Sequence, residues 1–136
     1  MSGNDSPTGR YAITLREHEA FNTHWVFTPD IVDQQTGETV FAFASTNWSM
    51  DGNQWRGDSV LELTLRKYPG NHRPADVSAI IDCEARTGAV GEGPAGPLDD
   101  LEARLDQALT WIYADPEEKK PPSGLLATLQ RFLRGR

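Results

Sequence analysis

Residues 91–96 (GEGPAG) have the glycine spacing G-x-G-x-x-G, which binds the phosphates of a dinucleotide when it links a strand to a helix. Other features of the sequence argue against that chemistry. The turns predicted before this stretch belong to an antiparallel sheet, not to a βαβ unit. Asp99, Asp100 and Glu102 also stand at the helix start, where a pyrophosphate would have to bind. We therefore predict a plain strand-to-helix connection and no nucleotide cofactor.

Side chains that bind metals or act as nucleophiles are few and widely spaced. They are His18, His24, His72 and Cys83, and no two of them have the short spacing of a metal site. Cys83 is the only cysteine and continues the apolar phase of Ile81, which predicts a buried, structural thiol. The sequence thus predicts no metal and no cofactor. An enzyme assembled from dispersed residues stays open as a third hypothesis, because such a site leaves no local pattern.

The C-terminal stretch has a pattern typical of contact with another surface. Charged residues and prolines predict a stiff polar linker over residues 116–124, and the apolar spacing after it predicts a basic amphipathic helix over 125–136. Such a short helix is marginal alone in water, so it must pack on its own sheet, in a partner's groove or, least favoured, on a membrane. The predicted partner-binding residues are Leu125, Leu129, Arg131, Phe132, Leu133 and Arg134, with Trp48 and Trp55 in the sheet.

Aromatic residues in the first half of the chain also predict a contact surface. Phe41 and Phe43 alternate with small apolar residues, so both faces of their strand are apolar. One face is expected to pack on a helix, and the other needs cover as well. The tail helix, closure of the sheet, self-association, a ligand or a protein partner would each supply that cover.

Alternation of apolar and polar residues predicts the strands that position these side chains. Turns are predicted at Thr36 and Gly37, at Asp51 and Gly52 between Trp48 and Trp55, and at Gly57 and Asp58. The clearest strands are expected over residues 11–16, 23–31, 40–44, 61–66 and 77–85.

Helical spacing then begins at Leu98 and predicts a helix over residues 98–114 that packs on one face of the sheet. The predicted fold class is α+β, with an antiparallel meander of about six strands. A small, partly closed β-barrel with a flanking helix is the alternative. The expected organisation is a flexible N-terminus over residues 1–10 and a single domain over 11–115, followed by the linker and the tail helix.

Charge and composition limit the classes of function. The 136 residues include 20 acidic and 13 basic side chains, a formal charge of -7, which disfavours nucleic acid as a partner. No signal peptide is visible at the start, so a cytoplasmic location is expected. We favour a non-catalytic adaptor or inhibitor, of the kind of a bacterial immunity protein, that contacts a basic protein or another copy of itself. The alternative is a binder of a small apolar ligand, held between sheet and helix.

Overall fold

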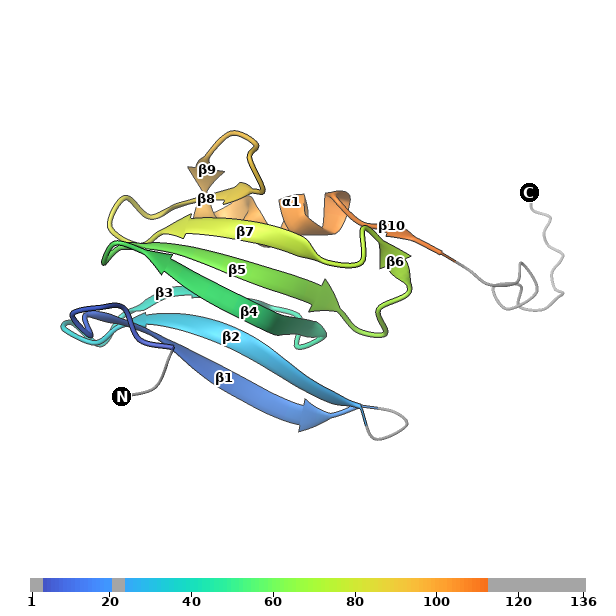
Figure 1. Cartoon of the computed structure of the whole chain (residues 1–136), viewed down its shortest axis with the longest axis horizontal. Coiled ribbons are helices and arrows are strands. Elements are labelled where there is room, and N and C mark those ends of the chain that lie inside the picture. The colour runs from blue at the N-terminus through green and yellow to red at the C-terminus, as the bar shows by residue number, and fades with distance from the viewer. Residues whose placement is uncertain (1–3, 21–23, 113–136) are drawn as a thin grey trace, which may run out of the picture.

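The computed structural model describes residues 4–20 and 24–112, which form antiparallel sheets (Figure 1). A three-stranded sheet contains β1 (Tyr11–Glu19), β2 (Trp25–Asp33) and β3 (Thr39–Ala42) in that order. A five-stranded sheet contains β4 (Trp48–Arg56), β5 (Val60–Lys67), β7 (Val77–Asp82), β8 (Thr87–Val90) and β9 (Gly96–Pro97). The short strand β6 (His72–Arg73) pairs with β10 (Thr110–Trp111).

Two short helical segments follow β9, namely the 3-10 helix η2 (Leu98–Asp100) and α1 (Leu101–Gln107). Figure 1 shows α1 behind β7 and β8. The approach is closest at Gly88, where an added Cβ would lie 2.7 Å from Cδ2 of Leu101. Glycine at this strand position therefore lets the helix reach the sheet.

The two main sheets meet where β2 runs beside β4 (Figure 1). Side chains join them here in place of a backbone ladder. The hydroxyl of Thr28 donates to the carbonyl of Trp48 at 2.7 Å, and the backbone N–H of Phe27 donates to the hydroxyl of Ser49 at 3.1 Å. Because Thr28 and Trp48 are both fully buried, this junction belongs to the core.

One hydrophobic core extends across both sheets. On β5 the buried leucines 61, 63 and 65 alternate with Glu62 and Thr64, as the period-2 pattern predicts. The same alternation buries Val77, Ala79 and Ile81 on β7. Leu98, Leu101, Leu105 and Leu109 cover this face from the helical side, and all four are buried.

Among the described residues, the predicted α+β class is confirmed as antiparallel sheets followed by the short helix α1. The sheets are not closed, so the alternative barrel is not formed. The finer prediction of a six-strand meander is not confirmed, because the strands divide among three sheets. The turns predicted at Gly37 and Gly57 are present, and both glycines have positive φ, at 81° and 71°.

The turn predicted at Asp51 and Gly52 is wrong. β4 continues through both residues, and its register against β5 shifts between Met50 and Gly52, which makes Asp51 a bulged residue. A β-bulge accommodates one extra residue without ending the pairing. The carboxylate of Asp51 forms an ion pair with Arg66 of β5 at 3.3 Å. Asp51 therefore helps to hold β4 against β5 and does not end the strand.

The helix predicted over residues 98–114 is much shorter, because α1 ends at Gln107. Thr110 and Trp111 form β10 instead, and the Trp111 ring packs edge-on against His72 with 5.0 Å between ring centroids. Threonine and tryptophan favour strands over helices, which agrees with this ending. Helical spacing from Leu98 would place Ile112 on the buried face of a helix over residues 98–114, but Ile112 is 37% exposed.

The N-terminal segment over residues 4–10 lies against the first sheet. Asp5 forms a β-bridge with Ala12, and the N–H of Ile13 donates to the carbonyl of Asn4 at 3.0 Å. Thr8 donates to Asp58 through its backbone N–H at 2.8 Å and through its hydroxyl at 2.5 Å. The prediction of a flexible segment over residues 1–10 did not anticipate these contacts.

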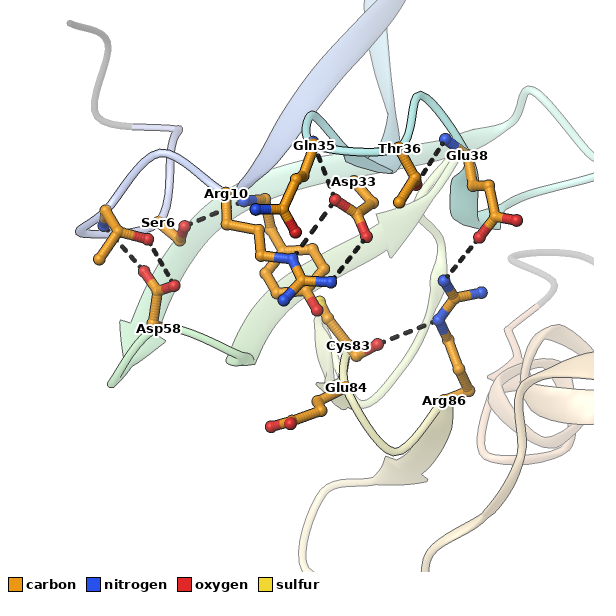
Figure 2. A network of polar contacts seen from close by, with 12 residues as sticks. Ser6, Arg10, Asp33, Gln35, Thr36, Glu38, Asp58, Cys83, Glu84 and Arg86 are labelled. Carbon is orange, nitrogen blue, oxygen red and sulfur yellow. Dashed lines mark hydrogen bonds and ion pairs between the residues drawn. The ribbon is translucent and has the colours of Figure 1, made fainter.

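Figure 2 shows the polar network that this segment forms with the turn between β2 and β3. Asp33 is 1% exposed, and its carboxylate accepts from the guanidinium of Arg10 at 3.2 and 3.5 Å. The backbone N–H of Gln35 donates to the same carboxylate at 2.9 Å. Hydrogen bonding from Arg10 lowers the pKa of Asp33, and hydrogen bonding from Thr8 lowers the pKa of Asp58.

These two carboxylates predict a loss of stability in acid. A folded-state pKa below the unfolded value stabilises the fold above the unfolded pKa, and this contribution disappears as the pH falls below about 4. Asp33→Asn is expected to flatten the fall of unfolding free energy between pH 6 and pH 3, although it lowers stability at pH 6. Urea unfolding at several pH values measures this slope. An identical slope in both proteins would contradict the assignment.

The linker over residues 116–124 and the amphipathic helix over 125–136 lie outside the described residues. The six tail residues predicted to bind a partner lie there too. Among residues 4–20 and 24–112, no helix is long and apolar enough to cross a membrane.

Candidate functional site

Trp48 and Trp55, predicted to bind a partner, lie on the inner face of the five-stranded sheet. Trp48 is fully buried and stacks on Phe43 with 5.4 Å between ring centroids, so it offers no surface to a partner. Trp55 is partly buried against the same core. Neither buried indole N–H has a hydrogen-bond partner among the described residues.

Trp25 is the tryptophan that faces solvent. Its side chain is 56% exposed at the start of β2. It lines a small hollow of about 100 Å³ with His24, Arg66 and the loop after β5. The loop residues Tyr68 and Pro69 also line an adjoining hollow of about 520 Å³, together with Glu19 and Asn47. We refer to these two adjoining spaces as the aromatic hollow.

Carboxylates accompany the aromatic rings at this site. In the β1–β2 register Glu19 lies opposite Trp25, and Glu17 lies opposite Phe27. Both glutamates are exposed and form no ion pair with a described residue. Directly opposite residues have Cβ atoms about 4.5–5.5 Å apart, so each carboxylate stands beside an aromatic side chain. Such a pairing attracts a cation both by its charge and by the ring faces.

Backbone hydrogen bonds fix both walls of the hollow. The N–H of Ala20 donates to the carbonyl of His24 at 2.6 Å, which closes the β1–β2 hairpin. The N–H of Tyr68 donates to the carbonyl of Asn47 at 2.8 Å, which holds the opposite wall. The rings of His24 and Tyr68, which both line the hollow, contact each other with 5.8 Å between their centroids and a tilt of 55°. The side chains of the site thus stand on constrained backbone.

His72 supports the loop that carries Tyr68 and Pro69. Its Nε2 accepts from the backbone N–H of Lys67 at 3.1 Å, while Nδ1 lies 2.7 Å from the carbonyl oxygen of Pro74. A neutral ring with its hydrogen on Nδ1 satisfies both contacts. With its side chain buried and both nitrogens engaged, His72 has a structural role.

The described residues carry an excess of negative charge that internal ion pairs do not cancel. Seven of their eight lysines and arginines form ion pairs, each with a different carboxylate. Those pairs use seven of seventeen acidic side chains, which leaves ten outside ion pairs with described residues. The described part of the chain therefore carries more carboxylates than its own cations pair. One of them, Glu19, lines the hollow, and Glu17 lies two positions before it on β1.

The other residues with chemical potential are placed for structure. Cys83 is buried as predicted, and burial raises the pKa of its thiol to about 12, which suppresses the reactive thiolate. Residues 91–95 form the loop of the β8–β9 hairpin, and β9 leads directly into the helical segment that begins at Leu98. Within the described ranges, no three His, Cys, Asp or Glu side chains are grouped to hold a metal ion.

In the strand predicted over residues 23–31, alternation puts Trp25 on the same face as Phe27 and Ile31, which agrees with β2. Alternation on β2 alone does not show that the apolar face ends before Trp25. On β1 the phase of Tyr11, Ile13 and Leu15 continues into Glu17 and Glu19, which cannot lie in an apolar core without partners. Pairing of the two strands puts Trp25 opposite Glu19. Glu17 and Glu19 are therefore the residues in the sequence that indicate a solvent-exposed end of this sheet face.

Comparison with known proteins gives no family for this chain. No protein-family model matches it, and no curated protein or solved structure is similar to it at a significant level. The functional assignment therefore rests on the geometry of the aromatic hollow.

Proposed function

We propose that the protein is a non-catalytic binding protein, of adaptor or inhibitor type, that holds a basic protein partner through the aromatic hollow. The observation that carries this proposal is Trp25, a large apolar side chain that is mostly exposed beside Tyr68 and Glu19. Tryptophan, tyrosine and arginine dominate the residues that supply most binding energy in protein interfaces. Trp25, Tyr68 and Arg66 bring all three types to one site.

Charge defines the chemistry of the partner. Arg66 is already paired with Asp51, whereas Glu17 and Glu19 have no cationic partner among the described residues. A lysine or arginine side chain entering the hollow would meet Glu19, Trp25 and Tyr68, which line it, with Glu17 two positions before Glu19 on β1. The acidic surface around the site would also steer a basic protein toward it, an effect that salt weakens.

Replacing Trp25 by serine is expected to weaken partner binding by about 30-fold or more, the loss typical of an interface hot spot of at least about 2 kcal/mol. The partner is captured from the source lysate on immobilised full-length protein, identified by mass spectrometry and titrated by calorimetry. The melting temperature should stay nearly unchanged, because Trp25 lies outside the core cluster.

Ile112→Ser is the matched control, because Ile112 is the other large hydrophobic side chain exposed among the described residues. It should change the dissociation constant by less than about threefold. Glu19→Gln should weaken binding and reduce its dependence on salt. An acidic partner, or a dissociation constant that Trp25→Ser leaves unchanged, would refute the proposed function.

A further inference from the structure

The end of the described chain leads to the aromatic hollow. The N–H of Ile112 donates to the carbonyl of Asn71 at 2.9 Å, and the side-chain amide of Asn71 donates to the carbonyl of Ile112 at 2.8 Å. Asn71 directly follows Gly70, which lines the hollow. Figure 1 shows β10, the loop after β5 and the hairpin end of β1 and β2 at the same right-hand end of the molecule. The remaining chain therefore starts beside the candidate site.

The sequence beyond Ile112 contains a segment whose chemistry matches the hollow. Residues 119–122 read Lys-Lys-Pro-Pro. Proline-rich segments dock in aromatic-lined grooves, because proline rings pack on aromatic faces and the extended conformation is already constrained. The two lysines supply the cations that Glu17 and Glu19 lack among the described residues.

Length and charge both permit this contact within one chain. Lys119 lies seven positions after Ile112, and an extended chain over that interval spans at most about 25 Å. Residues 1–112 contain 8 basic and 17 acidic side chains, whereas residues 119–136 contain 5 basic and none that is acidic. A tether this short gives an effective concentration in the millimolar range, so even weak contacts are occupied.

We infer that residues 119–122 bind in the aromatic hollow of their own chain, and that a basic partner must displace them. This inference rests on the proposed function for the role of the hollow. It gives the linker a binding role. We call the free protein self-masked, because residues 119–122 then occupy the aromatic hollow that a partner would use. The partner's docking segment then shares the chemistry of the masking segment, with lysines next to prolines.

The test uses full-length protein in which residues 119–122 are all replaced by alanine. NMR resonances of the Trp25 indole and of the Glu19 and Tyr68 amides should move, and the wild-type positions should not depend on protein concentration. Arg131→Ala with Arg134→Ala is the control, because it removes the same charge from a later part of the tail. Unmoved resonances in the first variant, equal shifts in both, or concentration dependence would overturn the inference.

A peptide of residues 116–125 provides a second measurement. It should bind the alanine variant about tenfold or more tightly than the wild-type chain, in which the tethered segment competes. Equal affinity for the two proteins would overturn self-masking. If the two affinities are equal but partner binding still depends on Trp25, self-masking is refuted and the proposed function is kept. If self-masking is found but Trp25→Ser leaves partner binding unchanged, the proposed function is refuted and self-masking is kept.

Discussion

Replacing Trp48 by alanine is expected to lower the free energy of unfolding by about 3–5 kcal/mol, the range for a large aromatic side chain removed from a core. Trp48 is fully buried and stacks on Phe43, and the Nζ of Lys67 lies 5.2 Å from its ring centroid. Its backbone carbonyl accepts the Thr28 hydroxyl that joins β2 to β4. The cavity would open at the junction of two sheets, where collapse requires both to move. Urea denaturation followed by circular dichroism measures the loss.

Trp48→Phe is the matched control for this prediction. Phenylalanine keeps a ring against Phe43 and removes the indole N–H, which is buried without a partner among the described residues. A buried donor without a partner costs free energy, so its removal offsets part of the lost packing. The expected loss is below about 2 kcal/mol. Equal losses in the two variants would show that packing of the aromatic ring is not the source of the stability.

Much of the sheet could be predicted from the sequence, because strand alternation is a local signal. The leucines 61, 63 and 65 are buried as their period requires, and Gly37 and Gly57 occupy turns that need positive φ. Cys83 shares the phase of Ile81 and is buried with it. In each case the residue types, their spacing and the tertiary structure favour the same conformation.

The errors arose where tertiary pairing outweighed a local preference. Asp51 and Gly52 have the composition of a tight turn, but pairing with β5 on both sides keeps them in one strand with a bulge. A turn there would have broken the contacts of Trp48 and Trp55 with the core. Local propensity is a weak guide when continuous pairing packs two tryptophans against the core.

The candidate site depended on information that no single segment contains. Four tryptophans were visible in the sequence, but their exposure depends on where the helix ends and how far each strand extends past the core. The β1–β2 hairpin extends beyond the face that α1 covers (Figure 1), so Trp25 is exposed while Trp48 is buried. The contact between this hairpin and the loop after β5 joins residues more than 40 positions apart.

The end of α1 gives a second prediction with a large expected effect. Leu105→Ala should lower the free energy of unfolding by about 2–5 kcal/mol, because Leu105 is fully buried in the core cluster. Ile112→Ala should cost less than about 1 kcal/mol, because its side chain is partly exposed beyond the helix. The pair is informative because helical spacing alone assigns Leu105 and Ile112 to the same buried stripe.

The two variants therefore separate two structures for residues 98–114. In a continuous helix, position 112 lies two turns beyond position 105 on the same face, so truncation at either site would open a comparable cavity. With α1 ending at Gln107 and β10 paired to β6, Ile112 is held by the backbone bonds to Asn71, which alanine retains. Urea unfolding midpoints at equal m-values give the comparison directly. A loss at Ile112 as large as that at Leu105 would favour the continuous helix, and it would also remove the anchor that places the start of the tail beside the aromatic hollow.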